Sequence, residues 1–214
     1  AAVGVDVTVL DRYASAARYT TRGQTTRGPI PGLIGDVGRH CAAAVDGRWW
    51  VVDGLSGAIA SVPPASFRLP EGRWSGVAAS GNMLALAGAG EIAVVDANTG
   101  ELRSRFPARV SPGWLYRLGD CSPLAIGDEW IVSLDPFGAR LGFYSASGDA
   151  LADLAISAIM PVEYLGVAAI GATGRTVGIA QGNRLDLVSV SGTCSRSVSS
   201  DSSGAGTPPI SAAE

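Results

Sequence analysis

The residue types that most often perform catalysis are sparse in this sequence. His40 is the only histidine, so a serine or cysteine nucleophile that needs an imidazole base would depend on it. Its neighbour Cys41 would lie on the opposite face of a strand, which keeps the two side chains apart. The carboxylates at 128–129, and Asp149 with Asp153, lack the fixed partner that acid–base catalysis requires. We therefore predict no catalytic residues and interpret His40 as a structural or surface residue.

Metal and cofactor motifs are not apparent either. Cys41, Cys121 and Cys194 are widely spaced and form no C-x-x-C pair, so a zinc site is not expected. Their odd number allows at most one intrachain disulfide, and buried free thiols are the alternative. Residues 88–93 match a G-x-G-x-x-A pattern, but strand-like residues follow where a dinucleotide site needs a helix. We expect no metal and no cofactor, and we interpret these glycines as a hairpin turn.

Length and composition favour an all-β protein. The 214 residues include 29 glycines and 12 prolines, and 47% are hydrophobic while 16% are charged. This composition is typical of short strands joined by tight turns, and the length suits a sizeable core. A formal net charge of −3 does not favour a nucleic-acid partner. Every apolar stretch ends well short of ~18 residues, so we expect no membrane span.

A hairpin pattern recurs along the chain. Each copy has an apolar run, an Asp or Ser, a tight turn with Gly and a second strand, at 51–60, 94–103, 143–152 and 187–196, and more weakly at 8–17. The Asp or Ser of each copy, which we call its anchor, is Asp11, Asp53, Asp96, Ser145 or Ser189. Successive anchors are 42, 43, 49 and 44 residues apart. An Asp or Ser side chain accepts hydrogen bonds from the backbone beyond it, and Gly supplies the positive φ that closes the turn.

Two further strands are expected before each hairpin. The nearer ones, with turns of their own, occupy 41–50, 83–92, 130–140 and 176–185. Shorter, innermost strands are expected at 33–38, 76–80, 123–127 and 165–171. The sequence thus predicts four strands in each repeat of about 40–45 residues, which is the period and strand number of a propeller blade.

One repeat carries a family resemblance. Within 69–106, Pro and Gly precede the inner strand and an apolar-Asp run ends in Thr-Gly; the residues concerned are Leu69, Pro70, Gly72, Gly81, Val94, Val95, Asp96, Thr99 and Gly100. Residues 160–180 are a looser copy. These segments resemble blades of the YVTN-type and PQQ-enzyme-like repeat families, whereas the Trp-Asp dipeptide of WD40 repeats is absent. The resemblance implies a β-propeller, a fold that hosts many functions.

We predict an all-β fold, a β-propeller or propeller fragment of four-stranded antiparallel blades. About four complete blades and an N-terminal half blade are expected within residues 1–196. Residues 197–214 are rich in Ser, Gly and Pro, and we expect a flexible tail or linker there. The chain either belongs to a larger propeller, which we favour, closes as a small ring, or is completed by another chain. A β-sandwich of hairpins is the alternative fold.

Aromatic and charged residues precede the predicted inner strands. The resemblance implies that such connections lie on one face of a propeller, around its central channel. Trp, Tyr and Arg are common where partners bind. We predict a binding rim, with packing between blades as the alternative, formed by Arg73, Trp74, Trp114, Tyr116, Arg117, Glu163 and Tyr164. At least one of Trp49 and Trp50 is expected in the core, and so is Trp130.

These expectations favour a non-catalytic binding or scaffolding propeller that presents loop aromatics and arginines to a protein or a small ligand. One alternative is a propeller-class enzyme, such as a dehydrogenase, lactonase or hydrolase, whose site lies partly outside this stretch. Another is a purely structural repeat module. An enzyme would need polar residues converging on the channel, and the predicted inner strands offer mainly Asp36. Because propellers that resemble YVTN repeats are often exported, we expect an extracellular or cell-envelope location, with the cytoplasm as the alternative.

Overall fold

The computed structural model describes residues 7–10, 15–20, 23–29, 40–53, 56–88, 90–110, 121–128, 130–135, 140–155, 168–173, 175–181 and 184–189. Every regular element within these ranges is a β-strand, and the strands form five antiparallel sheets. No described segment is a helix of the length and apolarity that would cross a membrane. The predicted all-β fold class is confirmed.

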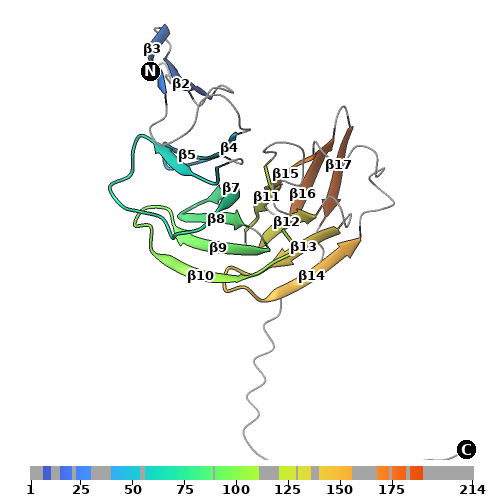
Figure 1. Cartoon of the computed structure of the whole chain (residues 1–214). Coiled ribbons are helices and arrows are strands. Elements are labelled where there is room, and N and C mark those ends of the chain that lie inside the picture. Colours follow the sequence, from blue (N-terminus) through green and yellow to red (C-terminus); the bar gives the residue numbers. More distant parts are fainter. Residues whose placement is uncertain are drawn as a thin grey trace, which may run out of the picture.

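Two sheets have the four-stranded meander of a propeller blade (Figure 1). The first consists of β7 (Trp74–Ser80), β8 (Met83–Gly88), β9 (Glu91–Asp96) and β10 (Leu102–Pro107). The second consists of β11 (Leu124–Ile126), β12 (Ile131–Asp135), β13 (Arg140–Tyr144) and β14 (Ala150–Ala155). In both sheets each strand pairs with the next along the chain, which is the arrangement that the repeat predicted.

Three further sheets have three described strands each. They are formed by β1 (Val7–Leu10), β2 (Ser15–Thr20) and β3 (Gly23–Pro29); by β4 (His40–Val45), β5 (Arg48–Asp53) and β6 (Ile59–Val62); and by β15 (Ala168–Thr173), β16 (Thr176–Gln181) and β17 (Arg184–Ser189). The strand predicted at 33–38 and the tail predicted at 197–214 lie outside the described residues.

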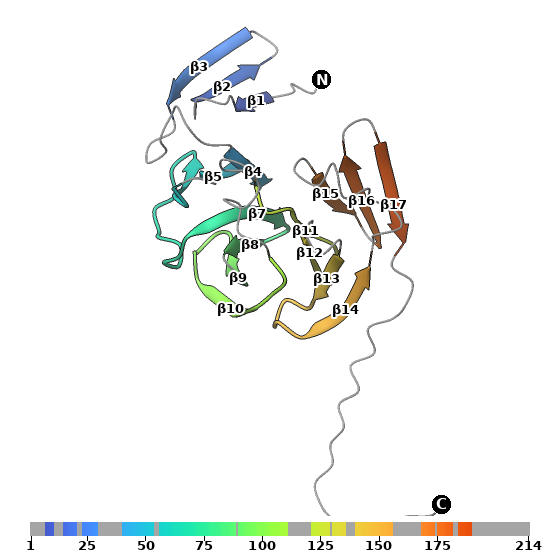
Figure 2. The same cartoon turned by 45° about the vertical axis from the view of Figure 1, so that its right-hand side comes forward.

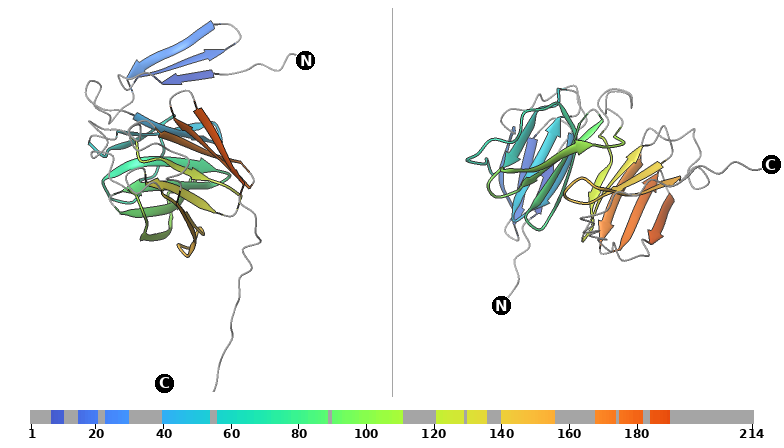
Figure 3. Two further views of the ribbon diagram at one scale, coloured as in Figure 1. Left: turned by 90° about the vertical axis from the view of Figure 1, so that its right-hand side faces the viewer. Right: turned by 90° about the horizontal axis from the view of Figure 1, so that it is seen from below.

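The sheets follow one another in chain order around the molecule (Figures 2 and 3). β4 contacts β7, β7 contacts β11, and β11 contacts β15, so these four are the inner strands. β4 therefore holds the inner position, whereas we had predicted its segment as a second strand. The hairpin β5–β6 accordingly contains the second and third strands of its sheet, and the copy at 51–60 is not structurally equivalent to the one at 94–103.

The core lies between successive sheets. Along β8, Leu84 and Leu86 face the sheet of β4–β6, while Ala85 and Ala87 face the sheet of β11–β14. All four side chains are 0% exposed. Because both faces of such a strand are buried, its sequence is continuously apolar instead of alternating with polar residues. A third apolar layer joins the sheets of β11–β14 and β15–β17.

Candidate binding site

Two residues of the predicted rim, Arg73 and Trp74, lie in the described part of the chain. The others are Trp114, Tyr116, Arg117, Glu163 and Tyr164, and they lie outside it. Trp74 is 1% exposed and packs in the layer between the β4–β6 and β7–β10 sheets. Its indole Nε1 donates a hydrogen bond to the carbonyl oxygen of Pro70 at 3.1 Å. Trp74 therefore has the packing role that was the alternative to a rim, whereas Arg73 is exposed.

Arg105 on β10 holds the segment that leads into β7. Its Cζ lies 5.5 Å from the centre of a ring of Trp74, and its Nη1 donates to the carbonyl oxygen of Glu71 at 3.2 Å. Its Nε donates to the Glu91 carboxylate at 2.9 Å. This hydrogen bond lowers the pKa of Glu91 and raises the pKa of Arg105. One cation thus fixes both the indole and the backbone before β7.

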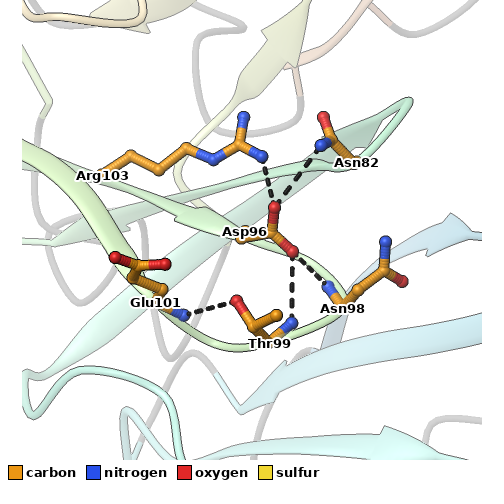
Figure 4. Close-up of polar contacts among 6 residues, drawn as sticks. All are labelled: Asn82, Asp96, Asn98, Thr99, Glu101 and Arg103. Atoms are coloured by element: carbon orange, nitrogen blue, oxygen red, sulfur yellow. Dashed lines mark hydrogen bonds and ion pairs between the residues drawn. The ribbon is translucent and has the colours of Figure 1, made fainter.

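The turn of the β9–β10 hairpin has the geometry that its sequence predicted (Figure 4). The Oδ1 atom of Asp96 accepts from the backbone N–H groups of Asn98 at 2.9 Å and Thr99 at 3.1 Å. Gly100, with a φ of 75°, donates its N–H to the carbonyl oxygen of Asp96 at 2.8 Å. The hydrogen bonds from Asn98 and from the Arg103 guanidinium lower the pKa of the Asp96 carboxyl group.

The same turn chemistry recurs in two other sheets. The N–H of Gly57 donates to the carbonyl oxygen of Asp53 at 2.7 Å, and the N–H of Gly148 donates to that of Ser145 at 3.0 Å. Both glycines have positive φ, at 75° and 98°. The predicted anchor-and-glycine turns are therefore confirmed at three of the repeats.

The two aspartates considered for acid–base work have separate structural partners. Asp153 accepts from Arg140 at 2.7 Å and forms an ion pair with Arg109 at 3.1 Å. The Asp149 carboxylate accepts from the hydroxyl of Ser147 at 2.8 Å within the turn after β13. Among the described residues, His, Cys, Asp and Glu side chains do not gather in threes around a point that could hold a metal ion.

A disulfide joins the inner edges of two sheets that are not neighbours. Cys41 on β4 is bonded to Cys121, just before β11, and their Cα atoms are 5.6 Å apart. Ser75 of β7 lies between them, with its carbonyl oxygen 3.3 Å from the Cys41 sulfur. Its hydroxyl lies 2.6 Å from that of Ser122, whose N–H also donates to the Ser75 carbonyl oxygen at 2.7 Å. The entries of three inner strands are thus tied together.

A cleft of about 390 Å³ opens beside β6, at the connection that leads to β7. It is lined by residues of β5, β6 and that connection: Trp50, Ile59, Ala60, Ser61, Pro64, Ala65, Phe67, Arg68 and Leu69. We call it the β6 cleft. The hydroxyl of Ser61 shapes one wall, because it donates to the carbonyl oxygen of Pro63 at 3.0 Å and accepts from the N–H of Ala65 at 2.8 Å.

Two aromatic rings that line the β6 cleft contact the guanidinium of Arg48, which lies beside the cleft. The ring centres of Trp50 and Phe67 are 5.8 Å apart, and the Cζ of Arg48 lies 5.8 Å from each ring. Trp50 is 3% exposed, so the core position expected for one of the two adjacent tryptophans is confirmed, as it is for Trp130 at 6%. The indole Nε1 of Trp50 and the Nε of Arg48 are buried without a hydrogen-bond partner.

Sequence analysis did not identify this cleft. Several of its residues lie in the connection after the hairpin predicted at 51–60, where no motif was found, and Arg48 lies in a strand where only core tryptophans were considered. The available signal was the Pro63-Pro64 pair followed closely by Phe67. Prolines exclude a regular fourth strand there, because they cannot donate to a sheet, and an aromatic residue in a connection needs a surface to cover it.

Solved structures with a similar fold are β-propellers. Virginiamycin B lyase from Staphylococcus aureus is similar at a TM-score of 0.54 and 11% identity, over 87% of this chain and 73% of that chain. A streptogramin B lyase is similar at 0.54 and 14% identity, over 88% and 66%. Hsv2 from Kluyvelomyces marxianus is similar at 0.55 and 10% identity, over 87% and 60%. At these identities the likeness shows the fold and nothing further.

The meander sheets and these similarities together define the class of the protein. It has a β-propeller fold built from repeated antiparallel blades. No protein-family model matches the sequence, and no curated protein does. The likeness to YVTN-type and PQQ-enzyme-like repeats therefore stays a resemblance.

Proposed function

We propose that the protein is a non-catalytic binding propeller that takes a ligand in the β6 cleft. The observation that carries this proposal is the meeting of two aromatic rings, the exposed Arg68 and an unpartnered indole N–H at one concave site, with Arg48 packed on the rings beside it. Sites for small molecules are typically apolar clefts of a few hundred Å³ in which a small number of polar groups fix the orientation. The β6 cleft has this composition and size.

The walls of the cleft are held in place by hydrogen bonds and by packing against a neighbouring turn. Ser61 fixes the start of the connection through its two hydrogen bonds. The β9–β10 turn packs against the other wall, where a Cβ added to Gly100 would lie 2.3 Å from a ring carbon of Phe67. A site that is formed before its ligand arrives loses less conformational entropy on binding, which favours affinity.

A screen of a chemically mixed fragment library by ligand-observed NMR tests the proposal. We expect fragments that bind the wild-type protein and lose binding in Phe67→Ala and Arg68→Glu, each of which alters one wall of the cleft. Arg175→Glu is the matched control, because it changes the same charge at an exposed turn between β15 and β16. If the variants and the control bind every fragment equally, the β6 cleft is not the binding site and the proposal is wrong.

We propose that the five rim residues outside the described part bind a partner, as the sequence predicted. Trp114 is the aromatic residue of this group to test first. A binding role requires that Trp114→Ala leave the free energy of unfolding within about 1 kcal/mol of the wild type, as for an exposed side chain. A loss as large as that expected for Trp74→Ala would instead show a packing role.

We also propose that the protein works in an oxidising compartment, outside the cell or in its envelope. The Cys41–Cys121 disulfide supports this location, since disulfides persist there and are rare in reducing cytosol. Alkylation of the protein purified from its native cells, followed by mass measurement, tests the proposal. We expect both cysteines to resist alkylation until a reductant is added. Alkylation of both without a reductant would contradict it.

A further inference from the structure

The arginines beside the β6 cleft differ from four other arginines of the described residues. Arg103, Arg105, Arg109 and Arg140 each form an ion pair with an aspartate or a glutamate. Within the described residues neither Arg48 nor Arg68 forms one, and no residue that lines the cleft is acidic. The cleft therefore has a positive charge that no described carboxylate neutralises.

Arg48 packs beside the cleft, although it is not among the residues that line it. Its Cζ lies 5.8 Å from the centres of two rings, Trp50 and Phe67, and both rings line the cleft. Its Nε is buried without an acceptor. A guanidinium is planar. When its face packs on aromatic rings, its N–H groups point outward in that plane, where a carboxylate can accept hydrogen bonds from two of them.

The indole of Trp50 adds a second donor without an acceptor. The side chain is 3% exposed and lines the cleft, and its Nε1 has no hydrogen-bond partner. Buried indole N–H groups usually find an acceptor, so this atom is an exception. Trp50 and Arg48 both lack an acceptor, and an anionic oxygen would supply one.

The rest of the cleft is suited to an apolar body. Ile59, Ala65 and Leu69 form apolar walls next to the Phe67 ring. A volume of about 390 Å³ accommodates one or two fused rings. A cationic ligand is disfavoured, because Arg48 already lies over both aromatic rings and would repel it.

We propose that the β6 cleft binds a small aromatic carboxylate. The carboxylate accepts hydrogen bonds from Arg48, Arg68 and the Trp50 indole, and the ring packs against Phe67 and the aliphatic wall. This inference rests on the proposed function, and it adds the chemical class of the ligand.

Three probes of one shape test the inference by calorimetry: 2-naphthoate, its neutral isostere 2-naphthamide, and the cation 2-naphthylmethylammonium. We expect 2-naphthoate to bind at least about tenfold more tightly than either of the others, since hydrogen bonds to an ionised group are the stronger ones. Arg48→Gln and Arg68→Gln should each weaken 2-naphthoate by about tenfold without affecting 2-naphthamide. Arg175→Gln is the control for the loss of one positive charge and should leave all three affinities unchanged.

The indole N–H resonances provide a second, local measurement. The protein has five tryptophans, and Trp50→Phe identifies the signal of Trp50 while keeping an aromatic ring in place. We expect 2-naphthoate to shift this signal downfield and Trp50→Phe to weaken binding several-fold. Equal affinity for 2-naphthoate and 2-naphthamide, or an unmoved Trp50 signal, would overturn carboxylate recognition. If fragments of other chemistry still require Phe67, the proposed function stands; if no fragment binds the cleft, both proposals fail.

Discussion

At the scale of single residues, Asp96 shows how a carboxylate can stabilise a turn through its charge. Its oxygens accept from two backbone N–H groups and from the Arg103 guanidinium. These donors favour the ionised form, so the pKa of Asp96 is lower in the folded protein than in the unfolded chain. Between the two pKa values the unfolded chain binds more protons. This stabilisation is therefore complete at neutral pH and is lost as pH falls below the ordinary aspartate range.

The first prediction concerns Asp96→Asn. We expect the variant to be less stable than the wild type at pH 7 and to lose less stability on acidification, because the group that titrates is gone. Urea titrations between about pH 3 and pH 7 measure both effects. Asp128→Asn changes an exposed aspartate and is the control. Parallel pH profiles for wild type and Asp96→Asn would show that the turn does not depend on the charge.

Trp74 gives the second prediction. Its ring is 1% exposed, its Nε1 donates to Pro70, and Arg105 covers one face. Trp74→Ala would leave a large cavity between two sheets, so we expect the free energy of unfolding to fall by about 3–5 kcal/mol. Arg73→Ala, at the exposed neighbouring position, should cost less than about 1 kcal/mol. Similar losses at both positions, measured by urea unfolding, would contradict the core role of Trp74.

At the scale of elements, the β9–β10 turn packs against Phe67, which lines the β6 cleft. Gly100 has a φ of 75°, and a Cβ there would lie 2.3 Å from Phe67. Gly90, in the β8–β9 turn, has a similar φ of 78° but open space around it. The two glycines therefore separate the cost of the backbone conformation from the cost of the contact.

The third prediction compares these two positions. Gly90→Ala should lower the free energy of unfolding by about 1–2 kcal/mol, because a side chain disfavours this backbone region. Gly100→Ala should cost about 2–4 kcal/mol, since Phe67 must also move. We further expect Gly100→Ala, and not Gly90→Ala, to weaken fragment binding in the cleft. Equal stability losses in thermal and urea unfolding would mean that the turn does not press on Phe67.

The hairpins were predictable because their signals are local. An Asp or Ser followed by Gly specifies a turn through contacts a few residues apart, and Asp53, Asp96 and Ser145 all behave as their sequence predicts. The inner position of β4 was not predictable, because the repeat pattern gives the order of the strands along the chain but not which strand lies innermost in its sheet. The β6 cleft was missed because it depends on contacts that are not local in the sequence. Trp50 and Phe67 meet only after two sheets and a connection have packed together.

At the scale of the whole molecule, the inner strands hold four of the five described sheets in one array. β4, β7, β11 and β15 contact one another in succession, and the apolar layers between sheets continue this order outward. The sheets of β7–β10 and β11–β14 depend on their neighbours, because both of their faces are covered by them. In such repeat architectures stability comes from the contacts between adjacent repeats. A covalent bond that spans more than one repeat therefore constrains several interfaces together.

The Cys41–Cys121 disulfide is such a bond, and it supplies the last prediction. It closes a sequence separation of 80 residues and passes beside Ser75 of the intervening sheet. Joining distant residues restricts the unfolded chain, so the double variant Cys41→Ser, Cys121→Ser should lose about 2–5 kcal/mol of unfolding free energy. Because both anchors lie at the inner strands, we expect the sheets of β4–β6 and β11–β14 to become more exposed to hydrogen exchange together. Cys194→Ser is the control and should change neither measurement, whereas exchange that increased in only one sheet would show that the bond does not couple the two.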